Sequence, residues 1–357
     1  MSRPLVITGD ILRLQRHGGV TRYVIEVATR LRRVVHVTGG LLRAEDTSRL
    51  GERLAPRLRM PVVPGAGWLA APFHALIDAR ALRREPRAIV HPSYFRDPAT
   101  LPATHPVVAT VFDLTHERFP NHAHVGAERW KRALCDRADR VICISESTRH
   151  DVVERLGVPD ARIRVAPLGA RDWGDVIPRP LAGTGEPFVL WVGPRHAYKN
   201  FGGALRAMGR CAEARDLTLL CAGGGPFTAA ERRLAAECGV TRAAQAVAAD
   251  AELRWSYEHA AALLYPSLWE GFGLPVVEAL ALGTPVVASN RASLPEVGGD
   301  AAFYADPNDA DALAAALGAA LREGRSPARV AAGVRQAARF SWDRCAALHE
   351  AAYAELE

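Results

Sequence analysis

The segment ALLYPSLWEGFGLPVVEALALGTPVVAS (262–289) carries the pattern that decides the fold. ALLYP (262–266) and PVVAS (285–289) are short apolar runs of the kind found in strands that are buried on both faces of a sheet. Between them, VVEALALG has the composition of a helix, and Pro275 suits the first turn of that helix. The order strand, loop, helix, strand predicts one unit of a parallel α/β sheet.

The same alternation of short apolar runs and helical stretches extends over the chain. The expected strands are LVIT (5–8), VVHVT (34–38), AIV (88–90), VVATVF (107–112), RVICI (140–144) and RIRVA (162–166) in the first half, and FVLWV (188–192), LTLLCA (217–222), QAVA (245–248), ALLYP (262–266), PVVAS (285–289) and AAFYA (301–305) in the second. The segment at 169–187 is rich in Gly and Pro and has the composition of a linker.

We therefore predict an α/β protein of two doubly wound, Rossmann-like domains that face a cleft. The expected boundaries are an N-terminal Rossmann-like domain at 1–170, a linker at 171–187, a C-terminal Rossmann-like domain at 188–339, and a final helix at 340–357 that can pack back on the N-terminal domain.

Length and composition agree with this interpretation. The chain has 357 residues, of which 49% are hydrophobic and 24% charged, which is enough for two cores. We see no apolar run of ~18 residues and no charged-then-apolar leader, so we expect a cytoplasmic location. The six cysteines include no C-x-x-C pair, and we expect reduced thiols in the core rather than metal ligands or disulfides.

Charge is distributed unevenly along the chain. Residues 1–170 contain 27 Lys and Arg against 17 Asp and Glu, whereas the remainder is net acidic. A basic half suits an anionic lipid head group, a membrane face or nucleic acid. Because no basic array interleaved with aromatic residues is present, we expect no nucleic acid partner. Nearly all the positive charge is arginine, and Lys131 and Lys199 are the only lysines.

Two acids, Glu270 and Glu278, flank the Gly-Phe-Gly-Leu-Pro turn at 271–275. Open α/β sheets bind ligands at the carboxyl ends of their strands, and the N–H groups of a helix start after glycines form a natural seat for a diphosphate. Carboxylates beside an anion site would repel the anion. We therefore expect the two acids to bind hydroxyl groups, one set on a sugar and one on a ribose.

This stretch resembles the E-x7-E signature of the retaining, two-domain (GT-B) glycosyltransferases of family 4, also called group 1, and the mannosyltransferase-like subgroup among them. SLPEVGGDAAFYADPND (293–309) is similar to the segment that follows the signature in that family. The resemblance implies that Glu270 engages the donor sugar and that Glu278 takes the ribose hydroxyls. It also assigns donor contacts to the turn between them, namely Gly271, Phe272, Gly273 and Leu274.

A pair of cations follows the first strand of the second half, in FVLWVGPRHAYKN (188–200). Arg195 and Lys199 just past a strand end suit a diphosphate leaving group, although the same spacing is compatible with a solvated loop. The segment resembles the phosphate-binding segment of the family. Many members place the arginine directly after the glycine, whereas Pro194 intervenes here, which makes Arg195 the less certain of the two.

Two motifs of the first half resemble the remaining parts of a family site. Gly18 and Gly19 open a helix in GGVTRY and correspond to the glycine loop that faces donor phosphates and acceptor; a tight strand–helix turn is the alternative. Asp113 and His116 follow a strand and could orient the acceptor and handle its proton, or simply cap a loop. Phe112 stands where many relatives have histidine, which puts catalysis in doubt.

Three patterns that imitate other sites carry less weight. Asp309 and Asp311 imitate the metal-binding acidic pair of the other glycosyltransferase fold, but they open a helix and suit capping. His122 and His124 could bind metal, yet no third ligand is near in sequence. The glycines of LTLLCAGGGPF (217–227) do not form G-x-G-x-x-G, which argues against an NAD-linked oxidoreductase.

The resemblance implies an enzyme of surface polysaccharide biosynthesis that transfers a sugar from a nucleoside-diphosphate donor, weakly favouring GDP-mannose, to a glycan, lipid-linked or small-molecule hydroxyl. No cofactor and no metal are expected, because cations and a helix start can stabilise the leaving diphosphate. A catalytically silent nucleotide-sugar binder or assembly partner is the alternative. The basic, amphipathic segment at 67–87 is either a weak peripheral membrane contact or a crossover helix packed on the sheet.

Overall fold

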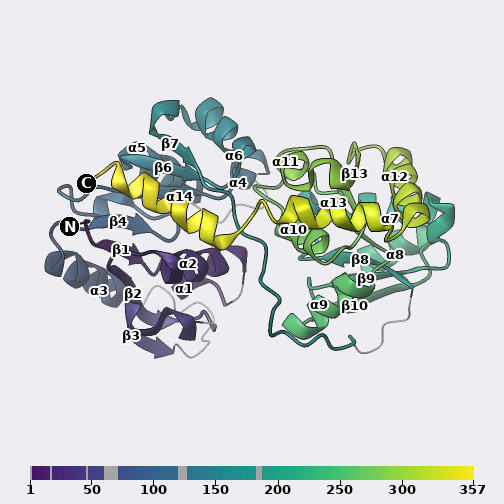
Figure 1. The fold of residues 1–357 in the computed structure, drawn as a ribbon, viewed down its shortest axis with the longest axis horizontal. Coiled ribbons are helices and arrows are strands. Elements are labelled where there is room, and N and C mark those ends of the chain that lie inside the picture. The colour runs from purple at the N-terminus through teal and green to yellow at the C-terminus, as the bar shows by residue number, and fades with distance from the viewer. Residues whose placement is uncertain (1, 17, 46, 60–70, 120–126, 182–186) are drawn as a thin grey trace. The chain divides into compact units, whose positions relative to one another are not determined.

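The computed structural model describes residues 2–16, 18–45, 47–59, 71–119, 127–181 and 187–357. The chain forms two compact units. The first comprises Met1–Gly169 together with Ser341–Glu357, and the second comprises Ala170–Phe340. The segment at 171–187 thus belongs to the second unit, and the C-terminal helix belongs to the first (Figure 1).

The sheet of the first unit is entirely parallel. Its strands are β1 (Leu5–Thr8), β2 (Val35–Leu42), β3 (Leu54–Arg59), β4 (Ile89–Pro92), β5 (Val108–Val111), β6 (Arg140–Cys143) and β7 (Ile163–Val165). They pair in the orders β3-β2-β1-β4 and β5-β6-β7, and a parallel bridge from Val90 to Val107 joins the two groups. The apolar runs predicted as strands in this half all lie on strands of this sheet.

Among the strands that the structure describes in this unit, only β3 has no counterpart in the expected set. Its sequence, LAPRLR, lacks a run of β-branched residues, and Leu58 is 45% exposed. β3 lies at the edge of the sheet and pairs with a neighbour, β2, on one side only. An edge strand does not need the continuous apolar pattern by which buried strands are recognised.

Helices of the first unit connect successive strands. They are α1 (Asp10–Leu14), α2 (Gly19–Arg30), α3 (Ala71–Arg84), α4 (Thr115–Arg118), α5 (Ala127–Arg137), α6 (Glu146–Asp151) and the C-terminal α14 (Trp342–Ala354). Figure 1 shows α14 lying across α2 and β6. No helix among the described residues is both long and apolar enough to cross a membrane.

A buried network of polar side chains joins α14 to the body of the first unit. The Tyr23 hydroxyl lies 2.8 Å from the Thr110 hydroxyl and 2.6 Å from His349 Nε2. His91 continues the network, with Nε2 2.8 Å from Thr110 and Nδ1 2.6 Å from the Tyr353 hydroxyl. Burial lowers the pKa of His91 to about 3 and that of His349 to about 4, so both rings are neutral in the folded protein.

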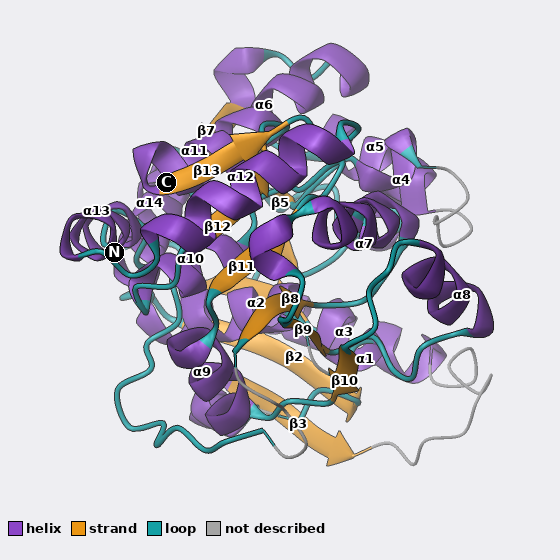
Figure 2. Cartoon of the chain, turned by 90° about the vertical axis from the view of Figure 1, so that its right-hand side faces the viewer, coloured by secondary structure: helices purple, strands orange, loops and turns teal. Residues whose placement is uncertain are grey.

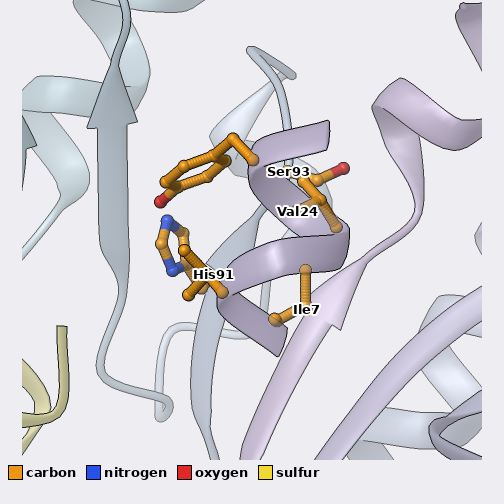
Figure 3. A pocket seen from close by; sticks show the side chains of 6 residues that line it. Ile7, Val24, His91 and Ser93 are labelled. Carbon is orange, nitrogen blue, oxygen red and sulfur yellow. The ribbon is translucent and has the colours of Figure 1, made fainter. Parts of the chain in front are cut away.

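A small cavity of about 10 Å³ adjoins this network and is lined by Ile7, Val24, His91 and Ser93 among others (Figure 3). Its size is that of a single water molecule, so this part of the first unit is closely packed.

The sheet of the second unit has the strand order of a dinucleotide-binding fold. Its strands are β8 (Phe188–Val192), β9 (Thr218–Ala222), β10 (Ala243–Ala246), β11 (Ala262–Tyr265), β12 (Val286–Ser289) and β13 (Ala302–Ala305). They pair, all parallel, in the order β10-β9-β8-β11-β12-β13. All six predicted strands of this half are confirmed, with ends that differ by two residues or fewer.

Two layers of helices cover this sheet. Its helices are α7 (Phe201–Arg210), α8 (Ala229–Glu237), α9 (Asp250–His259), α10 (Leu274–Ala281), α11 (Leu294–Gly298), α12 (Ala310–Glu323) and α13 (Pro327–Ala337). α7 contacts α8 and α12, whereas α10 contacts α9, α11 and α13, and Figure 2 shows the two groups on opposite faces. The winding direction reverses between β8 and β11, which makes the carboxyl ends of these strands the expected ligand site.

Candidate active site

The candidate site of the second unit lies at this reversal point. Lys199 and Glu270 come from the loops after β8 and β11, and the structure brings them together: Lys199 Nζ is 2.6 Å from Glu270 Oε1. The two side chains are each only 11% exposed. Lys199 Nζ also donates to the Tyr265 hydroxyl at 2.8 Å, and burial, with the Glu270 charge, raises the pKa of that phenol well above its usual value. The pair forms an oriented, largely dehydrated charge centre.

The loop that carries Glu270 is held by side chains whose roles the sequence did not indicate. Ser293, at the start of α11, lies with its hydroxyl 2.9 Å from the Glu270 carbonyl oxygen and 2.8 Å from that of Phe272. Leu268 N–H donates to the Tyr198 carbonyl oxygen at 2.7 Å and ties this loop to the one after β8. The position of the Glu270 carboxylate is therefore fixed before any ligand arrives.

Asn200, next to Lys199, connects three loops. Its backbone has the left-handed conformation that asparagine tolerates, with φ 59°. Its side-chain oxygen accepts from Gly203 N–H and caps α7, while its amide donates to the carbonyl oxygens of Pro266 and Pro307 at 3.1 and 2.7 Å. This residue fixes the end of the short helical turn that presents Lys199.

The turn between the two acids forms the start of α10. Gly273 precedes the helix with φ 106°, and a side chain there would clash with Leu294. Pro275 lies in the first turn, as predicted from its position. The first N–H groups of a helix lack intrahelical acceptors and favour an anion. Phe272 is buried and packs edge-on against Phe340, 5.4 Å between ring centroids, so a ligand can use its backbone but not its ring.

Glu278 lies one turn further along α10 and is 3% exposed. Its Oε2 accepts a hydrogen bond from the Tyr257 hydroxyl of α9 at 3.0 Å. The two acids of the motif therefore have different partners, Glu270 a cation and Glu278 a phenol. A carboxylate oxygen can accept more than one hydrogen bond, which binding of a ligand diol would require.

Arg195, the other cation predicted for this segment, makes a separate set of contacts. Its guanidinium turns to the glycine loop after β9, where it donates to the carbonyl oxygens of residues 223–226 at 2.8–3.2 Å and to Glu231 at 2.7 Å. It also lies over the Phe227 ring, 4.7 Å from the centroid, and is 3% exposed. A guanidinium engaged on every nitrogen anchors a loop, so Lys199 is the cation that this segment directs toward Glu270.

Glu231 shows how strongly Arg195 is held. Burial by itself would raise the pKa of this carboxyl, but hydrogen bonds from Arg195 and from the Thr228 N–H outweigh burial and lower it. Thr228 and Glu231 also form a capping box at the start of α8.

In the first unit, Gly18 and Gly19 stand at the start of α2, after the loop that follows β1. A side chain at Gly18 would overlap that of Gln15. Tyr23 of the same helix is buried and belongs to the network with Thr110. It also packs edge-on against Phe112 at 5.1 Å, so α2 meets the carboxyl end of β5.

Asp113 and His116 follow β5, with Asp113 in the turn and His116 on the single-turn helix α4. Asp113 Oδ1 accepts the Thr115 N–H at 2.9 Å, which is the capping contact considered as its alternative role. Both residues are half-buried. Lys131 of α5, the second lysine of the chain, is 0% exposed and contacts this segment.

A second charged cluster, which no motif predicted, lies at the carboxyl ends of β1 and β4. Asp10 and Asp78 both pair with Arg96, at 3.2 and 2.8 Å, and Asp78 also pairs with Arg13 at 2.7 Å. Burial raises the pKa of Asp10, although Arg96 beside it acts in the opposite direction. The direct succession of strand, glycine and acid in LVITGD is the local signal that could have indicated this place.

Other expectations concern metals and thiols. Asp309 caps α12 by accepting from the N–H groups of Asp311 and Ala312, which confirms capping as its role. His122 and His124 lie outside the described residues. The described part of the chain contains no cluster of three or more metal-binding side chains. All six cysteines are free thiols, and five of them are buried, as predicted.

Comparison with known proteins identifies the family. The model described as "Glycosyltransferase Family 4" matches residues 17–171, and "Glycosyl transferases group 1" matches residues 176–337. The two matches together span both units, and the second includes the Lys199–Glu270 pair and α10. The chain belongs to the group 1 glycosyltransferases of family 4.

Similar curated proteins of this family include mannosyltransferases. O-antigen chain mannosyltransferase B of Escherichia coli is 47% identical over 97 residues, which cover 27% of this chain and 26% of that protein. MMP alpha-(1->4)-mannosyltransferase of Mycolicibacterium hassiacum is 29% identical over 272 residues, which cover 70% of this chain and 65% of that protein. The matches thus span less than two thirds of the length of either relative.

Solved structures show the fold of this glycosyltransferase family over the whole chain. HepE of Anabaena in complex with UDP and glucose superposes with a TM-score of 0.75 at 16% identity and covers 99% of each chain. The predicted α/β fold with two Rossmann-like domains, known as GT-B, is confirmed.

Proposed function

We propose that this glycosyltransferase moves a hexose from a nucleoside-diphosphate sugar to a hydroxyl group with retention of the anomeric configuration. The observation that carries the proposal is the Lys199–Glu270 pair at the reversal point of the second sheet. In this proposal Lys199 stabilises the charge that the diphosphate gains, and Glu270 binds hydroxyls of the sugar. Glu278 binds the ribose.

The electrostatics of the site support this division. Nucleoside diphosphate is already a good leaving group, so catalysis depends on stabilising developing charge rather than on protonating it. An ammonium held by Glu270 and Tyr265 needs little reorganisation during the reaction. At the start of α10, Pro275 has no N–H and the amides of Val276 and Val277 donate to the Gly273 carbonyl oxygen, so we assign the further donor to the Leu274 N–H.

The proposed reaction uses no metal or other cofactor. Lys199 and the helix start supply the positive charge for which some transferases use a divalent ion. With the acceptor bound in the first unit, Asp113 and His116 would orient its hydroxyl and take its proton. We favour front-face attack through an oxocarbenium-like state over a covalent glycosyl-enzyme intermediate.

For substrates we favour GDP-mannose as donor and a glycan, a lipid-linked sugar or a small hydroxyl compound as acceptor, in surface polysaccharide biosynthesis. Support comes from the O-antigen mannosyltransferase among the similar proteins. A thermal-shift panel with GDP, UDP, dTDP and ADP tests the base, because a ligand at ~100 times its dissociation constant stabilises by about 2.7 kcal/mol. GDP release from GDP-mannose, with methyl α-mannoside as acceptor, tests turnover; absence of both binding and turnover for every donor would refute the proposal.

One observation favours a second candidate, a catalytically silent nucleotide-sugar binder or assembly partner. Phe112 replaces the histidine of many relatives, is 7% exposed and packs on Tyr23, so that position holds no titratable group. Nucleotide binding without sugar release from any donor would support this candidate over the enzyme.

We also propose a weak peripheral contact with anionic membranes through α3. The helix packs on β2, as a crossover helix does, but only Asp78 and Leu82 along it are buried. Phe73 and Leu76 are 39% and 59% exposed. Several arginines follow on the same helix. An apolar edge beside cations suits the surface of an anionic bilayer. The first part of the predicted segment, residues 67–70, lies outside the described residues.

Sedimentation with vesicles tests this contact. We expect weak binding to vesicles that contain anionic lipid, reduced by 0.5 M salt and by Arg83→Glu combined with Arg84→Glu, because salt screens exposed charges. Vesicles of phosphatidylcholine alone are the control. Binding to neither kind of vesicle at low salt would reject the contact and favour a soluble acceptor.

A further inference from the structure

Lys131 is one of only two lysines in the chain, and the site described above does not use it directly. Its side chain is 0% exposed. Nζ donates to the backbone carbonyl oxygen of Asp113 at 2.8 Å and to Glu117 Oε2 at 2.7 Å, and it lies 5.0 Å from the centroid of the Phe95 ring. A buried ammonium is costly unless it is paired and hydrogen-bonded, so these contacts define where this side chain can lie.

The segment that Lys131 contacts cannot hold its own shape. Helix α4 has four residues, a single turn, and helices of that length are unstable without tertiary contacts. Two ion pairs supply those contacts: Glu117 with Lys131 on one side, and Arg118 with Asp151 on the other. Asp151 is 2% exposed. His116 directly precedes the two paired residues, so their contacts fix the backbone of the turn from which its side chain extends.

We propose that Lys131 is a positioning residue of the transfer reaction. Its ammonium fixes residues 113–118, so that Asp113 and His116 meet the acceptor hydroxyl in a productive geometry. This inference rests on the proposed function, because it takes Asp113 and His116 as the groups that act on the acceptor. Lys131 itself is too deeply buried to touch a substrate.

The expected effect falls on turnover and not on donor binding. Displacement of reacting groups by about 1 Å can cost about 10²-fold in rate. We therefore expect loss of the Lys131 contacts to lower kcat about 10- to 100-fold. The residues proposed to contact the nucleotide lie in the second unit and at Gly18 and Gly19, outside the segment that Lys131 holds, so its dissociation constant should stay within twofold of wild type. A residue that only supported the fold would lower both together.

The experiment uses paired variants, because Lys131→Met alone leaves the Glu117 carboxylate buried without its cation. Lys131→Met combined with Glu117→Gln removes both charges and keeps the volume. The matched control is Arg132→Met on the same helix, since Arg132 donates instead to the carbonyl oxygens of Arg155 and Leu156. Each full-length variant is measured for its thermal midpoint, GDP affinity, kcat with GDP-mannose, and amide hydrogen exchange.

The proposal expects a double variant that is folded, binds GDP normally and loses turnover, while the control matches wild type. The amides of Arg118 and Phe119, which donate to Leu114 and Thr115, should exchange faster. Unchanged exchange, or turnover within threefold of wild type in a folded double variant, would overturn the proposal. If wild-type protein transfers no sugar, the proposed function fails instead, and exchange still decides whether Lys131 holds this segment.

Discussion

Substitution of Lys199 by methionine removes the only charge of this side chain and keeps most of its length. At an effective dielectric constant of about 20, unit charges about 4 Å apart interact by about 4 kcal/mol. Loss of one preorganised donor to developing charge typically costs about 10²- to 10³-fold in kcat, or about 2.7–4 kcal/mol. The two magnitudes agree, so we expect Lys199→Met to lower kcat about 10²- to 10³-fold.

The same substitution affects stability, and the two effects must be separated. Lys199→Met leaves the Glu270 carboxylate without its cation in a site where both side chains are 11% exposed. We expect about 1–3 kcal/mol of destabilisation, less than for a fully buried pair. Arg210→Met is the matched control, because Arg210 pairs with Asp311 in the same unit but is 50% exposed, and exposed pairs contribute about 0–1 kcal/mol.

The assay follows GDP release from GDP-mannose at a temperature where circular dichroism shows each variant fully folded. Saturation curves separate kcat from KM, and the loss should fall mainly on kcat because the charge develops in the transition state. A folded Lys199→Met protein that keeps more than a third of the wild-type kcat/KM would refute the role of this cation.

Three further outcomes follow from the structure. Glu278→Ala should weaken GDP binding at least tenfold in calorimetry, whereas Glu270→Ala should spare GDP binding and cost turnover; equal loss of GDP affinity in both would contradict this division. Activity should survive excess EDTA, and activity lost in EDTA and restored by Mn²⁺ or Mg²⁺ would overturn the metal-free reaction. The pKa values of His91 and His349 in the folded protein are lowered to about 3 and 4, whereas the unfolded value is about 6.5. Between these values the unfolded chain binds more protons than the folded protein. The free energy of unfolding should therefore fall as the pH drops below about 6.5. Each ring can lower the free energy of unfolding by at most about 1.4 kcal/mol per pH unit. The midpoint of urea unfolding should therefore be lower at pH 5 than at pH 7, and equal midpoints would show that these rings do not stay neutral and buried.

The sequence by itself determined the parallel strands and the order of their connections. Strands covered on both faces must be apolar along their whole length, so runs such as FVLWV (188–192) mark them directly. Local signals were also enough to predict where two helices begin. Pro275 lies in the first turn of α10 and Asp309 caps α12, and both preferences depend only on neighbouring residues of the chain. The edge strand β3 was not predicted, because one of its edges has no partner strand and its sequence has no continuous apolar run.

Tertiary structure alone decided which charged side chains meet. Arg195 and Lys199 are four positions apart and equally cationic in sequence, yet one turns to a loop after β9 and the other to Glu270. Lys131 reaches Asp113 and Glu117 from a different helix, over a separation that no local pattern records. Backbone periodicity is set by nearest neighbours and by burial, whereas side-chain pairing depends on which loops the folded sheet brings to the same edge.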